Sequence, residues 1–165
     1  METVLILDFG AQYSQLIARR VREQNVYCEV KPCSISPAEI EKIAPIGIIL
    51  SGGPQSVYES VSPHVDPALF ALGIPVLGIC YGCQLMAYSL GGTVAAATEA
   101  TAREYGKTLT EFDTDCSIFQ GLPASSVTWM SHGDYISQVP DGFAVTAKTA
   151  VCPTAAMACP EKKLY

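Results

Sequence analysis

The chain has 165 residues and carries 10 basic and 16 acidic side chains, which gives a formal charge of −6. The length is that of one globular domain, and a composition of 49% hydrophobic and 16% charged residues excludes a disordered chain or a coiled coil. The acidic excess is spread evenly over both halves, without a basic face or tail, so nucleic acid and anionic membranes are poor candidate partners.

From the sequence we expect neither a membrane-spanning helix nor a signal peptide in these residues. No apolar run reaches the roughly 18 residues of a membrane-spanning helix, and residues 1–8, METVLILD, lack the basic start of a signal peptide. The seven cysteines are an odd number, which fits free thiols in a reducing compartment better than a disulfide framework. We therefore expect a cytoplasmic protein.

Short apolar strands alternate with amphipathic helices in the first half of the chain. The strands are predicted at residues 4–7, 27–30, 46–50 and 74–79. The helices are predicted at residues 12–24, from 37 onward, at 67–72 and at 84–90. Ser36, Pro37 and Glu39 form an N-terminal helix signature. This alternation is typical of an α/β fold, in which helices cover both faces of a mostly parallel sheet.

After residue 92 helical patterns become scarce. Strands are predicted at residues 93–97, 107–112, 127–130, 143–147 and 155–159, as an antiparallel extension of the same domain. Residues 160–163 predict a turn, and Leu164 and Tyr165 predict the first step of a strand returning along residues 155–159. A hairpin with one arm leaves backbone groups unpaired. We therefore expect residues 1–165 to form a single domain that is incomplete at its C-terminal side.

The sequence GICYG at residues 78–82 joins a predicted strand to a predicted helix. It matches the nucleophile elbow, with Cys80 as the nucleophile. The small neighbours Gly78 and Gly82 allow a sharp turn, the helix N-terminus stabilises a thiolate, and the Tyr81 N–H can point at a developing oxyanion. The alternative is that Cys80 packs as a small buried hydrophobe. The strand, the two glycines and the helix together favour the nucleophile.

Two further patterns are less specific. Cys80 and Cys83 form a C-x-x-C, which suits redox chemistry or half of a zinc site, but no second pair stands at metal spacing, so we expect Cys83 to pack in the helix. The sequence SGGP at residues 51–54 follows a predicted strand, where ligand crevices form in α/β sheets. It is either a tight turn or a donor to an oxyanion. It matches neither a Walker loop nor a GxGxxG motif.

A cysteine nucleophile needs a base, and the chain has two histidines. His64 lies in a predicted loop next to Pro63, and we expect it to be solvated. His132 follows a predicted strand and has Asp134 close by in sequence. From the residues alone, His132 is the better candidate base, with a hydrogen-bonding loop histidine as the alternative.

Together these motifs resemble those of the class I (triad-type) glutamine amidotransferases, and within that family the glutaminase domains of GMP synthases. The likeness runs from residue 3 to residue 165. Its segments are ILDFGAQYSQLIARR at 6–20, ILSGGPQSV at 49–57, GICYGCQ at 78–84 and MSHGD at 130–134. The elbow is common to the class, whereas the first and last segments select the GMP synthase branch. The resemblance implies a flavodoxin-like core.

The resemblance also implies roles for individual residues. Cys80 would attack the side-chain amide of glutamine and form a glutamyl thioester, and the N–H groups of Gly53 and Tyr81 would form the oxyanion hole. The residues that would hold the α-amino and carboxylate groups of glutamine are Gln84, Ser131, Gly133 and Asp134. His132 would then belong to the substrate-binding segment and would not be the base. Cys83 stands where the family usually has methionine.

In the family, the base and its orienting carboxylate lie in a His-Pro-Glu motif that follows a Lys-Lys-x-Tyr segment, and this sequence ends with KKLY at residues 162–165. We therefore expect little glutaminase activity from the 165 residues alone. The resemblance implies no metal or cofactor for the glutaminase reaction. The resemblance implies a homodimeric parent enzyme that aminates xanthosine monophosphate. ATP and Mg²⁺ would act in its ATP-pyrophosphatase domain. We expect that domain and a dimerisation domain to be absent from these 165 residues.

Two other functions remain open from the sequence. The chain could be an amidotransferase subunit for another acceptor, as in anthranilate or CTP synthesis, although the opening segment at residues 6–20 argues against that. It could also be a non-catalytic interaction module that keeps the fold.

Overall fold

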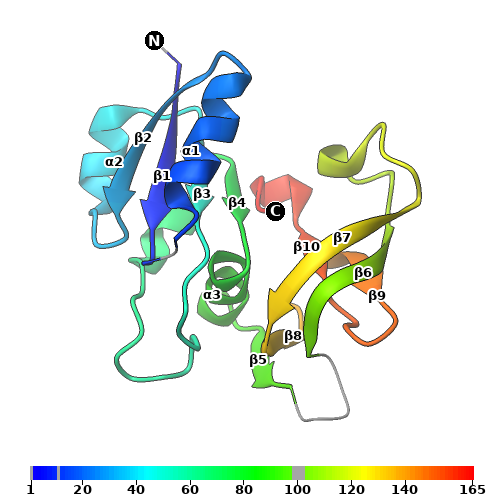
Figure 1. The fold of residues 1–165 in the computed structure, drawn as a ribbon. Helices are drawn as coiled ribbons and strands as arrows, with labels where there is room; N and C mark the ends of the chain where they lie inside the picture. The colour runs from blue at the N-terminus through cyan, green and yellow to red at the C-terminus, as the bar shows by residue number, and fades with distance from the viewer. Residues whose placement is uncertain (1, 11, 98–102) are drawn as a thin grey trace. The chain divides into compact units, whose positions relative to one another are not determined.

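The computed structural model describes residues 2–10, 12–97 and 103–165 (Figure 1). The chain divides into two compact units: unit 1 is formed by residues 1–86 and 160–164, and unit 2 by residues 87–159 and Tyr165. Within the described ranges, no helix combines the length and apolar character needed to cross a membrane.

Unit 1 is built on a four-stranded parallel sheet with the strand order β2-β1-β3-β4. Its strands are β1 (Thr3–Asp8), β2 (Tyr27–Pro32), β3 (Gly47–Leu50) and β4 (Val76–Gly78). Its helices are α1 (Ser14–Glu23), α2 (Pro37–Ile43), the 3₁₀ helix η1 (Pro67–Ala71) and α3 (Tyr81–Ser89), whose last turn is counted in unit 2. The predicted parallel sheet and the α/β class are confirmed.

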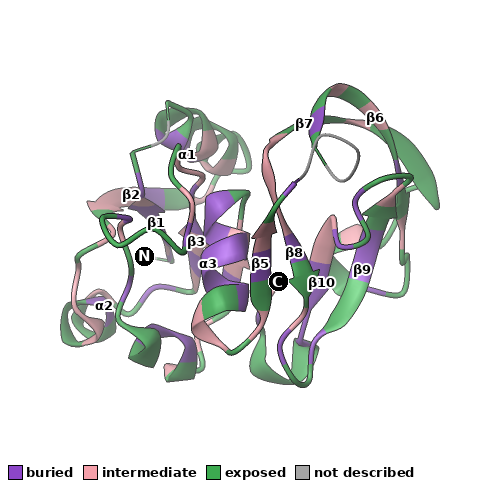
Figure 2. Cartoon of the chain, turned by 90° about the horizontal axis from the view of Figure 1, so that it is seen from below, coloured by how far each residue is buried: buried purple, intermediate pink, exposed green. Residues whose placement is uncertain are grey.

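The sheet of unit 1 is buried on both faces. Leu5, Ile6 and Leu7 are all fully buried in β1, although successive side chains of a strand point to opposite faces. On one face, Ile6 packs with Ala18 of α1 and Cys28 of β2. Such continuous apolar strands are what a parallel sheet covered on both sides requires. Helix α3 is likewise buried along most of its length, as its purple colour in Figure 2 shows.

Helix α3 and strand β4 of unit 1 begin at other residues than predicted. Helix α3 begins at Tyr81, three residues earlier than predicted, because the chain enters the helix directly after Cys80. Strand β4 begins at Val76 because Pro75 has no N–H to donate to a neighbouring strand. The short helix predicted at residues 67–72 is confirmed as a 3₁₀ helix over residues 67–71.

The end of the chain also differs from the prediction. Residues 160–162 form the 3₁₀ helix η3 (Pro160–Lys162), and Lys163 adopts a φ of +57°. Leu164 then forms a parallel bridge with Val76 of β4, whose N–H donates to the Lys163 carbonyl at 2.9 Å. The expected return along residues 155–159 is therefore wrong. Leu164 is 1% exposed, so burial of this side chain in unit 1 accounts for the different partner.

Unit 2 is antiparallel. One sheet has the strand order β10-β9-β6-β7, and β5 and β8 form a separate two-stranded ribbon. The strands are β5 (Thr93–Ala96), β6 (Glu104–Phe112), β7 (Ser125–His132), β8 (Asp134–Gln138), β9 (Ala144–Thr149) and β10 (Ala156–Ala158), and the 3₁₀ helix η2 is Ser117–Phe119. The antiparallel extension is confirmed. Strand β8 was not predicted, because Asp134 and Gln138 interrupt any apolar pattern there.

Candidate active site

Cys80 occupies the sharp turn between β4 and α3. It is exposed and has a φ of +54°, a left-handed conformation that costs energy for any residue with a side chain. Its carbonyl accepts hydrogen bonds from the N–H groups of Cys83 and Gln84, both at 3.0 Å, so the helix starts at once. A thiol at such a turn projects away from the backbone at the N-terminus of a helix.

Two glycines enforce this turn by close packing. A Cβ on Gly78 would lie 2.6 Å from the Cα of Cys83, and a Cβ on Gly82 would lie 2.4 Å from the carbonyl oxygen of Leu50. Both contacts are with backbone, which cannot rotate away. Glycine is therefore required on both sides of Cys80.

Ser51 connects the carboxyl ends of β1 and β3 to the first turn of α3. Its N–H donates to the Leu7 carbonyl at 3.1 Å, its Oγ accepts from the Phe9 N–H at 3.2 Å, and its carbonyl accepts from the Gly82 N–H at 3.1 Å. Ser51 is fully buried. The strand order reverses between β1 and β3, and ligands of open α/β sheets bind at this kind of position.

Gly53 and Tyr81 lie on segments that pack tightly against each other. A Cβ on Gly53 would lie 3.1 Å from the Phe9 carbonyl oxygen and 3.3 Å from Cγ of Tyr81. The Tyr81 ring is buried beside Phe9, and its hydroxyl donates to the Pro63 carbonyl at 2.6 Å. Burial raises the pKa of Tyr81, so the hydroxyl remains a donor. As the first residue of α3, Tyr81 has a backbone N–H without an intrahelical partner.

The other residues singled out in unit 1 lie where the sequence places them. Gln84 is buried in α3, one turn after Cys80. Cys83 is half-buried in the same helix and, like Cys80, is not in a disulfide. His64 is exposed in the segment before η1. Ala11, in the middle of the opening motif, lies outside the described residues.

In unit 2, the MSHGD segment forms a junction between two strands. Strand β7 continues to His132, and Asp134 already belongs to β8, so only Gly133 separates the two strands. The prediction that the strand ends at residue 130 and that His132 lies in a loop is wrong, because β7 remains paired with β6 as far as His132. The Gly133 carbonyl accepts from the Ala97 N–H at 2.8 Å. Ser131, Gly133 and Asp134 are thus held on strand ends.

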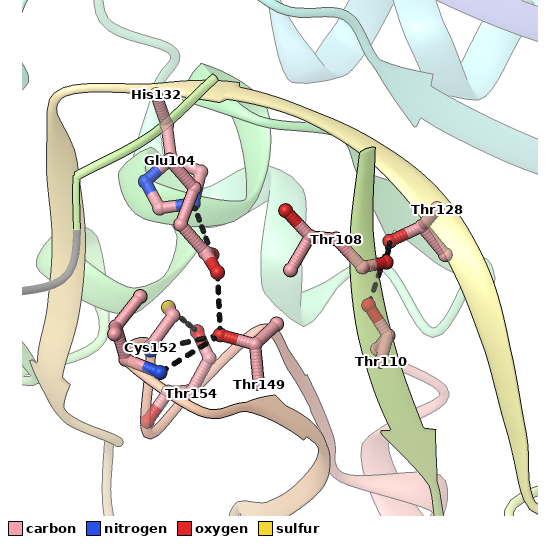
Figure 3. Close-up of polar contacts among 9 residues, drawn as sticks. Glu104, Thr108, Thr110, Thr128, His132, Thr149, Cys152 and Thr154 are labelled. Carbon is pink, nitrogen blue, oxygen red and sulfur yellow. Dashed lines mark hydrogen bonds and ion pairs between the residues drawn. The ribbon is translucent and has the colours of Figure 1, made fainter. Parts of the chain in front are cut away.

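A buried carboxylate lies next to His132, and the sequence did not predict it. Glu104 Oε2 lies 3.2 Å from Nε2 of His132, and the side chains are 6% and 14% exposed. The hydroxyl of Thr149 donates to Glu104 Oε1 at 2.7 Å (Figure 3). Sequence proximity had suggested Asp134 as the acid near His132. Glu104 stands 28 positions earlier and faces His132 because the two are register partners across β6 and β7, a pairing that only the strand register reveals.

The same place also holds three potential metal ligands. In the described ranges, Glu104, His132 and Cys152 offer ligand atoms that all lie within 4.8 Å of one another. Burial raises the pKa of the Cys152 thiol, and the charge of Glu104 raises it further, which favours the protonated thiol over a thiolate ligand. Both oxygens of Glu104 already have hydrogen-bonding partners. The cluster is therefore explained as a hydrogen-bonded network.

A cavity of about 540 Å³ lies elsewhere in unit 1, between β2 and α2. It is lined by Lys31, Pro32, Ser34, Ile35, Glu39, Lys42 and Ile43. None of these residues belongs to the segments around Cys80, so the cavity does not serve the candidate site.

The comparisons with known proteins agree on one family. The family model described as "Glutamine amidotransferase class-I" matches residues 5–165. GMP synthases of Caldanaerobacter subterraneus and Clostridium botulinum are 57% and 54% identical over 164 residues, which is 99% of this chain and 31% of each relative. A Thermoplasma acidophilum protein of known structure, described provisionally as belonging to a GMP synthase, has a TM-score of 0.83 and 28% identity over 100% of this chain and 81% of its own.

These matches differ in how much of each protein they cover. The chain spans about a third of the length of the two curated relatives. The match therefore does not by itself transfer the activity of those whole proteins to this chain. The family match, in contrast, covers nearly the whole chain and both units.

Proposed function

Because this chain belongs to the class I glutamine amidotransferase family, we propose that it hydrolyses the side-chain amide of glutamine through Cys80. The observation that carries the proposal is the geometry of Cys80: an exposed thiol with a φ of +54° between two glycines that have no room for a side chain. Strain of this kind is retained where the surrounding structure enforces it, and it concentrates at active sites.

The proposed reaction proceeds in two steps. The sulfur of Cys80 bonds to the amide carbon, and the N–H groups of Gly53 and Tyr81 stabilise the oxyanion that forms. The carbon–nitrogen bond then breaks, and ammonia leaves with the proton that the thiol gave up. Water attacks the resulting thioester, glutamate is released, and the thiol regains its proton. The tight packing around Gly53 and Tyr81 supports this role, because oxyanion donors act best when they are held in place beforehand.

Recognition of glutamine is proposed for residues of the GICYGCQ and MSHGD segments. The residues that we propose for its α-amino and carboxylate groups are Gln84, Ser131, Gly133 and Asp134. The carboxylate of Asp134 suits the α-ammonium group, and the hydroxyl of Ser131 suits a carboxylate. Their support is that the family match at residues 5–165 includes both segments, and that Ser131, Gly133 and Asp134 lie at the junction of β7 and β8.

The ammonia is proposed to aminate xanthosine monophosphate to GMP. The support is that relatives at 53–57% identity over 99% of this chain are GMP synthases. In this proposal an ATP-pyrophosphatase domain, using ATP and Mg²⁺, activates the acceptor within a longer homodimeric enzyme of the cytoplasm. The glutaminase step itself uses only a thiol, backbone N–H groups and water.

Labelling with 6-diazo-5-oxo-norleucine, a glutamine-like electrophile, tests the proposal. We expect modification of Cys80 alone among the seven cysteines, suppressed by millimolar glutamine and abolished in Cys80→Ala. Cys83→Ala is the matched control, since it removes the neighbouring thiol of the same helix and should leave the labelling unchanged. Equal modification of several cysteines, unaffected by glutamine, would instead indicate a non-catalytic module that retains the fold.

Turnover gives a second test. The His-Pro-Glu motif that supplies the base in the family does not occur in the 165 residues. Members of a catalytic triad act as a unit, so without the base we expect turnover several powers of ten below that of a complete glutaminase. The measurement is glutamate formation by the purified 165-residue chain. Turnover at the rate of a complete enzyme would show that another residue acts as the base.

A further inference from the structure

Glu104 makes the most unusual polar contacts in unit 2. Its carboxylate is 6% exposed at the beginning of β6, and nothing in the reaction proposed above uses it. A buried carboxylate loses its hydration, and ion pairs of this kind can often be replaced by apolar residues without loss of stability. The position of Glu104 therefore calls for an explanation other than stability.

The first contact of Glu104 is with the imidazole ring of His132. Nε2 of His132 lies 3.2 Å from Oε2 of Glu104, so the ring and the carboxylate share a hydrogen bond. The other ring nitrogen, Nδ1, is buried and has no hydrogen-bonding partner among the described residues. Within that part of the chain, Glu104 provides the hydrogen bond that orients the ring.

The second contact anchors the carboxylate itself. The hydroxyl of Thr149 donates to Oε1 at 2.7 Å, and the same oxygen of Thr149 accepts from the N–H groups of Cys152 at 2.9 Å and Val151 at 3.3 Å (Figure 3). Thr149 is thereby tied to the turn that follows β9. Glu104 thus connects this turn to the end of β7 through two hydrogen bonds.

Holding the His132 ring in place also restrains the residues next to it in the chain. Gly133 follows it directly and has no side chain of its own to hold the backbone, and Ser131 and Asp134 flank the pair. We propose that Glu104 is a positioning residue for glutamine binding, acting through His132 on the segment formed by Ser131, Gly133 and Asp134. This inference rests on the function proposed above. Thr149 has the same positioning role, because its hydroxyl orients the Glu104 carboxylate, which in turn orients the His132 ring.

The experiment measures glutamine binding separately from the chemistry of the thiol. Iodoacetamide alkylates Cys80 in the 165-residue chain, and the glutamine concentration that halves the alkylation rate gives a protection constant. We expect Glu104→Ala to weaken protection about tenfold, the loss expected for one hydrogen bond to a charged group. The alkylation rate without glutamine should stay within about twofold, because Glu104 contacts His132 and Thr149, whereas the turn at Cys80 is held by Gly78 and Gly82.

Four further variants separate positioning from a general loss of structure. Thr149→Val should also weaken protection, whereas Thr149→Ser, which keeps the hydroxyl, should restore it. When Glu104→Ala and Thr149→Val are combined, the two losses of glutamine protection should not add, because both residues act through one hydrogen-bond network. The matched control is Glu111→Gln on the same strand, a carboxylate that is 62% exposed and paired with Lys148, and it should change nothing. Near-ultraviolet circular dichroism confirms native packing of each variant.

The outcomes distinguish the two proposals. If glutamine does not protect Cys80 in the unaltered chain, the proposed function fails and this inference fails with it. If glutamine protects the unaltered chain and protects natively folded Glu104→Ala and Thr149→Val equally well, only the positioning role is overturned. Weaker protection in Thr149→Ser as well would also overturn it, because the hydroxyl would then not be the group that matters.

Discussion

The backbone of Cys80 is determined by its neighbours rather than by the cysteine itself. Cysteine gains nothing from a φ of +54°, and the chain adopts it because Gly78 and Gly82 let β4, β3 and α3 approach each other closely. The result is an exposed thiol in a protein whose other cysteines are buried or half-buried. Burial also raises the pKa of the Cys152 thiol. Less of it is therefore present as the reactive thiolate at neutral pH.

Replacing one of these glycines tests how strictly the turn is enforced. In Gly82→Ala, the added Cβ would stand 2.4 Å from the Leu50 carbonyl oxygen, so β3 and α3 must separate. We expect the free energy of unfolding, measured with urea, to fall by about 2–3 kcal/mol. Gly47→Ala is the control, because its Cβ meets only the Pro75 carbonyl at 3.8 Å. An equally stable Gly82→Ala protein would mean that the turn is looser than described.

At the scale of elements, local signals explain where several of them begin. Helix α2 starts where Ser36 and Glu39 form a capping box: the Ser36 Oγ accepts from the Glu39 N–H at 3.3 Å, and Glu39 Oε2 accepts from the Ser36 N–H at 3.0 Å. The pattern of Ser36, Pro37 and Glu39 predicted this start correctly. The end of β7 was not predictable in this way, because its pairing with β6 as far as His132 determines it.

The capping box gives a prediction for α2. Ser36→Ala removes the side-chain acceptor of a helix only seven residues long, and we expect the free energy of unfolding to fall by about 1 kcal/mol. Ser36→Thr keeps the hydroxyl and should lose no more than a few tenths of that amount. Thermal unfolding followed by circular dichroism makes the comparison. A loss of equal size in both variants would point to packing at position 36 instead of the cap.

At the scale of the whole molecule, the chain exposes an apolar sheet face. The register of β6 and β7 pairs Leu109 with Val127 and Lys107 with Trp129, which puts these side chains on one face. Leu109, Val127 and Trp129 are 60%, 58% and 75% exposed, and the Lys107 ammonium lies 5.8 Å from the centre of the Trp129 ring. Contiguous exposed apolar patches promote association of proteins that present them.

Self-association of the purified chain should follow from this face. We expect sedimentation at increasing concentration to show association that Trp129→Ser and Leu109→Ser each reduce. Val61→Ser in unit 1 is the control, because Val61 is 77% exposed but belongs to no comparable face. Association that responds equally to all three substitutions would show that general surface hydrophobicity is responsible.

The sequence predicted one part of the candidate site, the turn at Cys80, but not the contact between Glu104 and His132. The turn at Cys80 could be predicted because the segment from residue 78 to 82 is local, and a strand, two glycines and a helix together leave few other conformations. The contact between Glu104 and His132 could not be predicted, because it depends on the register of two strands 28 positions apart. The family resemblance separated His132 from the role of base, which spacing to Asp134 alone had suggested.

The sequence by itself determined the α/β class, the elbow at Cys80 and the family, because each is encoded in short segments that are nearly independent of one another. Only the tertiary structure decided the parallel pairing of Leu164 with Val76, the extension of β7 to His132 and the burial of Glu104. These three features depend on which segments meet across the fold. Burial and strand register, rather than local preference, determine such contacts.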